Sequence, residues 1–254
     1  TLGKKFNKLP NRPKDKGEYI GREVLLELYN IPKLIPVNAS VCAVEYQGAS
    51  GYNQADLYEH QSLNSESNNA VKHTIGIDKG ADLETQLDIQ MMSQTFENVE
   101  LWYWGSSAWL YTFAVDFMNT DNVPNILSMS WGWSETDQCS ITNCLGNMTS
   151  QKYVERVNVE YAKLGLRGIT LVVASGDAGA PGRTDEMCAT HNVHAVFPGG
   201  SPFVTSVGAT FVQVSDTMKS WKTPLCQNYG CNSGTKQFPT NFVNQSWTTG
   251  GGFS

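Results

Sequence analysis

Residues 149–175 read "TSQKYVERVNVEYAKLGLRGITLVVAS", and this stretch decides the fold class. Its first part repeats apolar side chains at helical spacing: Val154, Val157, Tyr161 and Leu164. The spacing predicts an amphipathic helix over 149–168 that ends at Gly168. The apolar, β-branched run 169–175 predicts a strand buried on both faces. A helix followed at once by a fully buried strand is typical of α/β proteins with a parallel sheet.

The same alternation runs along the rest of the chain. Further strands are predicted at 40–46, 99–104, 124–131 and 201–210, and further helices at 82–98 and 109–119. Strands and helices in rotation predict an α/β fold whose mainly parallel central sheet is covered by helices on both faces. Ligands of such sheets bind beyond the carboxyl ends of the strands. This rule directs attention to "QGASGYN", "GWSE" and "GDAGAPG", which follow residues 46, 131 and 175.

Composition narrows the class of protein. The 254 residues are 40% hydrophobic and 17% charged, enough apolar content for one large domain or two small ones. A net charge of −6 argues against a nucleic-acid partner, and no apolar run is long enough to predict a membrane span. The basic stretch at the start is expected to form an exposed arm over 1–20. The alternative is that it forms a docking strip for another segment.

Cysteines and sequons point to a compartment. Of six cysteines, the pairs Cys139–Cys144 and Cys226–Cys231 each suit a short disulfide-closed loop, and none has the spacing of a zinc site. Three N-glycosylation sequons begin at Asn38, Asn147 and Asn244. Together they favour a secreted or a lysosomal or vacuolar protein. The histidines of "HNVH" at 191–194 have no third ligand nearby in the sequence, so no metal site is expected in this chain.

The segment "ADLETQLDIQMM" at 81–92 places Glu84 and Asp88 four residues apart on a predicted helix. Like charges at this spacing repel by a few tenths of a kcal/mol, so their placement needs a reason. A helical wheel puts the two acids between two apolar stripes, and a third group of residues forms the predicted solvent face. The first stripe is Leu83, Leu87 and Met91, the second Ile89, Met92 and Phe96, and the solvent face Gln86, Gln90, Ser93, Gln94 and Glu97.

The wheel therefore predicts that Glu84 and Asp88 point toward the sheet. Two neighbouring carboxyl groups that are shielded from water cannot both ionise cheaply, so one pKa rises and the pair can share a proton. Carboxyl pairs with perturbed pKa values cluster at active sites. The alternative is a structural one, in which each acid pairs with a Lys or Arg from elsewhere in the fold.

A third acid, Asp177, lies in the Gly-rich loop directly after the buried strand 169–175. A protonated carboxyl group there can donate a hydrogen bond to a developing oxyanion. The structural alternative is an Asp that caps a turn or a helix. No G-x-S-x-G nucleophile motif is present.

The ordered set of motifs resembles the sedolisins, or serine-carboxyl peptidases, from about residue 20 to the end. The matching stretches are "LLELYNIP" (25–32), "GADLETQLDIQMM" (80–92), "SMSWG" (128–132), "ASGDAGAPG" (174–182), "FPGGSPFVTSVGAT" (197–210) and "SWTTGGGFS" (246–254). The resemblance implies a subtilisin-like three-layer fold and a peptidase with a serine nucleophile.

The resemblance also assigns roles. Glu84 would be the general base, Asp88 would hydrogen-bond Glu84 and share its proton, and Asp177 would be the oxyanion acid. Glu45 and Trp131 would form the pair behind them that extends the proton network. The cleft that binds substrate backbone would be lined by Ser130, Trp131 and Gly132. A catalytic set of carboxylic acids implies activity in acid, on a peptide or protein substrate.

Three departures from the family pattern matter. Ala178 stands where many members have Ser, which is not the nucleophile. No G-T-S motif, which carries the family's nucleophilic Ser, occurs here, and the calcium site expected of the family lies downstream of the matched region. Segment 1–20 has no family counterpart.

The absent Ser leads to an expectation about a partner chain. We expect 21–254 to be the N-terminal two-thirds of a catalytic domain, incomplete by itself, with the Ser on a second, C-terminal chain cut from the same precursor. The family includes a member with a heavy and a light chain. The alternatives are a truncated chain, a non-catalytic peptide-binding pseudo-peptidase, and a generic α/β binding domain whose acids are structural. Endopeptidase and tripeptidyl-peptidase specificity both stay open, as does the pairing of the cysteines.

Overall fold

The computed structural model describes ten stretches of the chain: 21–22, 25–26, 29–32, 38–48, 50–95, 98–185, 189–212, 237–239, 241–242 and 247–250. The expected arm over 1–20, the cysteine pair at 226 and 231 and the sequon at Asn244 lie outside them. The chain divides into two compact units, one formed by 1–33 with 212–237 and the other by 34–211 with 238–254.

The described part of the first unit contains a short helical segment. The N–H of Leu25 donates to the carbonyl of Gly21 at 3.1 Å, and that of Tyr29 donates to Leu25 at 3.0 Å. Leu26 is buried there.

The second unit contains a six-stranded sheet in the order β2-β3-β1-β4-β6-β8. Its strands are β1 (Ser40–Glu45), β2 (Val71–Gly76), β3 (Glu100–Gly105), β4 (Ile126–Met129), β6 (Thr170–Ala174) and β8 (Thr205–Val207). All five neighbouring pairs are parallel. The predicted α/β fold with a mainly parallel sheet is therefore confirmed.

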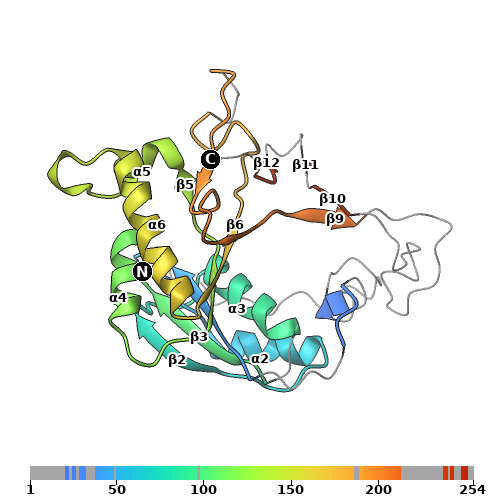
Figure 1. Ribbon diagram of the computed structural model, residues 1–254. Helices are drawn as coiled ribbons and strands as arrows, with labels where there is room; N and C mark the ends of the chain where they lie inside the picture. The colour runs from blue at the N-terminus through green and yellow to red at the C-terminus, as the bar shows by residue number, and fades with distance from the viewer. Residues whose placement is uncertain are drawn as a thin grey trace, which may run out of the picture. The chain divides into compact units, whose positions relative to one another are not determined.

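Helices cover both faces of this sheet (Figure 1). α2 (Gln54–Leu63) and α3 (Leu83–Thr95) lie together on one face, and α4 (Leu110–Met118) and α6 (Ser150–Leu166) lie together on the other. The short elements are β5 (Trp133–Ser134), η1 (Glu135–Asp137), α5 (Gln138–Ile141), η2 (Leu145–Asn147), β7 (Val196–Phe197), β9 (Thr210–Val212), β10 (Gln237–Pro239), β11 (Asn241–Phe242) and β12 (Trp247–Thr248). β5 pairs with β7 in an antiparallel ladder.

Successive side chains of β1 alternate between the two faces, as the pleat of a strand requires. Cys42 and Val44 belong to the apolar cluster under α4 and α6. Ala43 belongs to a smaller cluster with Leu57 of α2 and Ile89 of α3. Glu45 has the parity of Ala43, so it faces the side of the sheet that α3 covers.

The predicted helix over 149–168 is confirmed as α6, with its four apolar positions buried and Gly168 at a φ of +87°. Two of the longer elements were not anticipated, α2 and β2, and neither were most of the short elements. α2 buries only Leu57 and Gln61, and β2 is an edge strand with mostly exposed side chains. Such elements carry little apolar periodicity, which is the signal that sequence reading depends on.

The wheel of α3 was right about Ile89, which is buried, and Met92, which packs against the core, but wrong about the other apolar stripe and part of the solvent face. Leu83, Leu87 and Met91 are exposed by 83%, 53% and 37%, whereas Ser93 and Gln94 of the predicted solvent face are buried. Ser93 Oγ donates to the carbonyl of Gln90 at 2.9 Å, and Gln94 Nε2 lies 2.7 Å from His60 Nε2 of α2, while no described residue hydrogen-bonds Gln94 Oε1. Polar side chains tolerate burial when they are bonded in this way.

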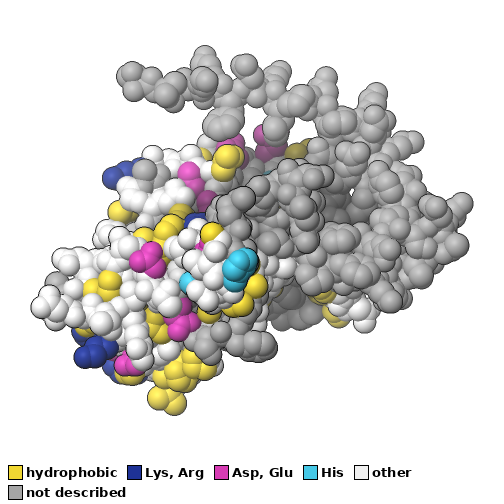
Figure 2. All heavy atoms as spheres, turned by 90° about the horizontal axis from the view of Figure 1, so that it is seen from above, with side chains coloured by type: hydrophobic (Ala, Val, Ile, Leu, Met, Phe, Trp, Pro, Cys, Tyr) yellow, Lys and Arg dark blue, Asp and Glu magenta, His cyan; other side chains and the backbone are white. Residues whose placement is uncertain are grey.

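Two further expectations concern the surface and the cysteines. Cys139 and Cys144 form a disulfide, as their spacing predicted. Figure 2 shows acidic side chains set singly among uncharged and hydrophobic ones, and the described part of this face carries no broad basic patch. Within the described residues, no helix is long and apolar enough to span a bilayer.

Candidate active site

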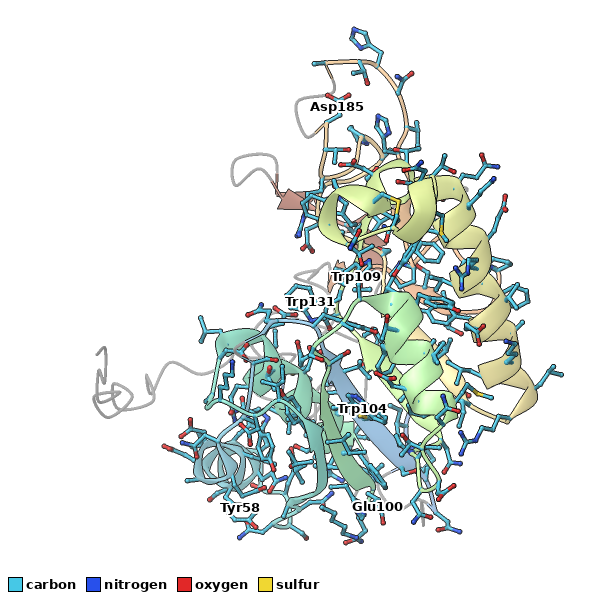
Figure 3. The ribbon with its side chains drawn as sticks, turned by 90° about the vertical axis from the view of Figure 1, so that its left-hand side faces the viewer. Tyr58, Glu100, Trp104, Trp109, Trp131 and Asp185 are labelled. Carbon is cyan, nitrogen blue, oxygen red and sulfur yellow. A yellow bond between two sulfur atoms is a disulfide. The ribbon has the colours of Figure 1, made fainter. Side chains whose placement is uncertain are left out.

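A cleft of about 440 Å³ opens at the carboxyl edge of the sheet, where the chain leaves β1, β4 and β6. Figure 3 shows Trp131 at this edge and Glu100, the first residue of β3, at the opposite edge. The lining comes from the three loops that the sequence had singled out, together with α3 and β7. It comprises Gln47, Glu84, Leu87, Asp88, Ser130, Trp131, Gly132, Trp133, Ala174, Gly176, Asp177, Ala178, Arg183 and Val196.

Asp82 fixes the start of the helix that carries two of the acids. Its carboxylate accepts hydrogen bonds from the N–H and the hydroxyl of Thr85, at 3.1 and 2.7 Å, and from the N–H of Gly51 at 3.0 Å. Burial tends to raise the pKa of Asp82, but these hydrogen bonds outweigh it and lower the pKa. Asp82 is thus an ionised N-cap, which was not predicted from the sequence although Asp is a preferred N-cap residue.

Asp88 is half-buried and is bonded to Ser130, the residue that follows β4. The Ser130 hydroxyl lies 2.7 Å from Asp88 Oδ2 and 3.0 Å from Oδ1. Burial raises the pKa of Asp88 to about 6, helped by the charges of Glu84 and Asp82 and opposed by the Ser130 hydrogen bond. The resemblance had placed Ser130 in the substrate-binding set, and the structure commits its side chain to Asp88.

Glu84 also lines the cleft and is half-buried. Burial raises its pKa above the ordinary value, and the nearby charges of Asp177 and Asp82 raise it further. Glu84 and Asp177 are more than ninety residues apart in the chain, so this electrostatic interaction arises from the fold. The three acids that the sequence selected lie around one cleft.

Glu45 and Trp131 form the pair that the resemblance predicted. The indole N–H of Trp131 donates to Glu45 Oε2 at 2.6 Å. Glu45 is fully buried, and no described residue hydrogen-bonds its Oε1. Burial raises the pKa of Glu45 to about 8; the Trp131 hydrogen bond lowers it, and the charges of the three acids on the α3 segment raise it. Glu45 therefore holds a proton at and below neutral pH.

Asp177 lies in a loop that needs two glycines, because Gly176 and Gly179 have φ angles of +101° and +62°. Its side chain is 54% exposed, and Oδ2 lies 3.6 Å from Nη2 of Arg183. The Arg183 guanidinium carbon in turn lies 5.5 Å from the centre of the Trp133 ring. No role was predicted from the sequence for Arg183 or for Trp133, although Trp133 lies in the "GWSE" stretch after β4.

Gly132 has a packing reason to be glycine. A Cβ at this position would lie 2.7 Å from Cγ1 of Val196 and 3.1 Å from the carbonyl oxygen of Phe197, both on β7. Any side chain would therefore push β5 away from β7 and reshape this wall of the cleft.

The Asp177 loop also contacts the last described segment of the chain. Gly250 donates its N–H to the carbonyl of Gly176 at 2.6 Å.

The remaining predicted sites lie elsewhere. Asn38 and Asn147 are exposed, as glycosylation of their sequons requires. The described residues contain no group of three or more His, Cys, Asp or Glu side chains placed to hold a metal ion.

Comparison with known proteins finds relatives of this chain. The chain is 42% identical over 245 residues to physarolisin of Physarum polycephalum, covering 93% of this chain and 43% of that protein. It is 30% identical over 143 residues to human tripeptidyl-peptidase 1, covering 52% of this chain and 22% of that protein. The chain thus spans less than half the length of these relatives. No family model matches it.

A solved structure has the same fold. A Pseudomonas sedolisin, described as a serine-carboxyl proteinase, superimposes with a TM-score of 0.65 at 20% identity, covering 94% of this chain and 63% of that one. The predicted subtilisin-like three-layer architecture is confirmed by this likeness together with the parallel sheet and its two helical layers.

Proposed function

Because this chain belongs with the sedolisins, as its motifs predicted, we propose that it supplies the acids of a serine-carboxyl peptidase that works in acid. One observation carries the proposal: Glu84, Asp88 and Asp177 line a single cleft at the carboxyl edge of the sheet. The raised pKa values of Glu84 and Asp88 support it, because perturbed carboxyl groups in a cleft are typical of active sites.

The proposed reaction is hydrolysis of a peptide bond through an acyl-enzyme. Glu84 takes the proton of a serine hydroxyl, and the serine oxygen attacks the peptide carbonyl. Protonated Asp177 donates a hydrogen bond to the oxyanion that develops. The amine product leaves with a proton from Glu84, and water then attacks the ester, with Glu84 again as the base.

Asp88 and Glu45 keep the site supplied with protons in this scheme. Asp88, with a pKa of about 6, and Glu45, with a pKa of about 8, are both neutral in moderate acid. When Asp88 and Glu45 are neutral they add no negative charge around Glu84, although Asp82 still raises the pKa of Glu84. The scheme therefore predicts a rate maximum well below pH 7.

The nucleophile is proposed to come from a second, C-terminal chain of the same precursor. No G-T-S motif occurs in these 254 residues, and the chain spans 43% of physarolisin. Calcium is proposed to bind outside this chain, because the resemblance places the family's calcium site downstream of the matched region. The Cys139–Cys144 disulfide and the exposed sequons support a secreted or a lysosomal or vacuolar setting.

Two changes test the proposal on the full-length protein. Glu84→Gln removes the base and Asp177→Asn removes the acidic oxyanion donor, so each is expected to lower kcat by about 10²-fold or more. The matched control is Glu155→Gln on the exposed side of α6, which is expected to leave kcat unchanged. Near-normal turnover in either variant, or a pH–rate maximum at or above pH 7, would contradict the assignment.

Native mass spectrometry separates this proposal from its rival. A companion chain that carries a G-T-S motif supports the peptidase. A lone folded chain that binds peptides without cleaving them supports the pseudo-peptidase. The choice between endopeptidase and tripeptidyl-peptidase follows from the products of a long peptide, because only the latter releases three-residue fragments from the amino end.

A further inference from the structure

Arg183 introduces a positive charge into a cleft that is otherwise acidic. Among the described residues that line the cleft, three are carboxylic acids and Arg183 alone is basic. It follows Asp177 by six residues and belongs to the same loop after β6. Nothing in the proposed catalytic cycle uses it.

Two contacts position the Arg183 side chain. Its guanidinium lies 5.5 Å from the centre of the Trp133 ring, within the range of a cation–π interaction. Its Nη2 lies 3.6 Å from Asp177 Oδ2, longer than the 2.7–2.9 Å that is typical of a charge-assisted hydrogen bond. A guanidinium has five N–H donors in a planar fork, so the group is held in place with donors left for a ligand.

The charge of this cleft changes with pH while that of Arg183 does not. Asp88, with a pKa of about 6, loses its negative charge in moderate acid, and the raised pKa of Glu84 acts in the same direction. Asp137, which accepts from the Trp133 indole at 3.5 Å, and Asp185, bonded to Thr190 and the N–H of Ala189, belong to the surroundings of the loop. Arg183 stays charged throughout, because arginine is protonated at any pH a protein meets.

We propose that Arg183 is a specificity-determining residue that binds a carboxylate of the peptide in the cleft. The geometry points to it because Trp133 holds the guanidinium at the wall of the cleft, next to the loop that carries Asp177. The ligand is a glutamate or aspartate side chain near the scissile bond, or a free C-terminal carboxylate. The inference rests on the proposed function for the nature of the ligand, a peptide.

Asp177 is the acidic neighbour of this guanidinium, with 3.6 Å between its Oδ2 and Nη2 of Arg183. A peptide carboxylate would therefore bind Arg183 beside Asp177, through guanidinium donors that Asp177 does not take. A peptide glutamate, with an ordinary pKa of about 4.3, is still mostly ionised at pH 5, which makes that pH suitable for a test.

The test measures equilibrium binding at pH 5 to the full-length protein carrying Glu84→Gln, which slows cleavage. Three otherwise identical fluorescent peptides serve as probes: one with an internal Glu and an amidated end, one with Gln and an amidated end, and one with Gln and a free end. A single partly exposed ion pair contributes up to about 1 kcal/mol, so Kd is expected to be about 5-fold lower for whichever carboxylate Arg183 binds. The first and third peptides distinguish the two sources.

Three further variants in the same background make the assignment specific. Arg183→Gln is expected to abolish the roughly 5-fold preference, and Arg183→Lys to retain part of it, since lysine keeps the charge but not the planar fork. Arg156→Gln, on α6 and outside the cleft lining, is the matched control and is expected to keep the preference. Equal binding of all three peptides, or a preference that survives Arg183→Gln, overturns the proposal.

The binding and turnover measurements distinguish failure of the Arg183 proposal from failure of the proposed function. If the preference depends on Arg183 but the unmodified protein cleaves none of the peptides, the proposed function is wrong and the carboxylate site stands. If the peptides are cleaved in acid but no preference exists, the peptidase stands and the role of Arg183 is rejected.

Discussion

On the face of the central sheet that α4 and α6 cover, β1 contributes Cys42 and Val44, whereas on the face that α3 covers it contributes Ala43 and Glu45. The first face is apolar and rich in aromatic rings: Trp102, Trp104, Phe113, Phe117 and Tyr161 all lie in its cluster. The second face has a small apolar cluster and several buried polar side chains beside it, Glu45, Ser50, Gln61, Thr85, Ser93 and Gln94 among them.

The difference teaches how one sheet serves two purposes. Aromatic packing over the first face buries large side chains, which contribute most of the hydrophobic stabilisation. The second face places carboxyl groups in a shielded environment, which costs stability and raises their pKa values. The aromatic side chains and the shielded carboxyl groups thus lie on opposite faces of the same sheet. Substitutions on one face can be made without changing the side chains of the other.

The largest expected effect concerns Glu45 and pH. A carboxyl group whose folded-state pKa is raised stabilises the fold fully below its unfolded pKa, and this contribution is lost as pH rises through the folded value. For Glu45 the window runs from 4.5 to about 8, and at about 1.4 kcal/mol per pH unit the loss is roughly 5 kcal/mol. Urea unfolding of the full-length protein between pH 4 and pH 9 measures it, because this range spans both pKa values.

Glu45→Gln isolates this contribution, because the amide cannot ionise. The variant is expected to lose much less of its free energy of unfolding over the same range, while Glu155→Gln keeps the dependence of the unmodified protein. Equal pH dependence in all three proteins would show that Glu45 is not responsible.

The next effect concerns the aromatic face. Phe113 of α4 is fully buried and has ring contacts with Tyr46, Trp104 and Phe117. Phe113→Ala is expected to lower the free energy of unfolding by about 3–5 kcal/mol, from lost burial and the cavity left behind.

The matched change on α3 is Leu83→Ala. Leu83 is 83% exposed, so the expected change stays within about 0.5 kcal/mol, although both positions read as apolar helix residues. Urea unfolding at pH 5 compares the two. Similar losses for both variants would contradict the buried faces assigned to α3 and α4.

The smallest expected effect is a change in the pKa of Asp88 when its hydrogen bond from Ser130 is removed. The bond lowers the pKa of Asp88, so Ser130→Ala is expected to raise that pKa above about 6, by about one pH unit for a hydrogen bond to a charged group. A carbon NMR titration of the Asp88 carboxyl group measures it. Ser128→Ala, two residues earlier in the chain, is the control, and an unchanged or lower pKa in Ser130→Ala would reject the assigned direction.

Several parts of the molecule were readable from single segments. The strand over 169–175 and the helix over 149–168 follow from composition and spacing alone, because burial on both faces or along one stripe leaves a regular pattern. The Cys139–Cys144 bond follows from the short loop between the two residues. The loops after β1, β4 and β6, to which the sequence directed attention, line one cleft, since parallel strands bring their carboxyl ends to one edge.

What the sequence by itself determined is therefore the fold class and the three acids, because α/β periodicity and acids in shielded or Gly-rich settings leave local traces. The tertiary structure decided the rest. It turned the Leu83 stripe of α3 outward, buried Ser93 and Gln94, paired Trp131 with Glu45, and brought Arg183 against Trp133. The buried side of α3 depends on the neighbouring helix and sheet, and a contact between side chains fifty or more residues apart exists only after the chain has folded.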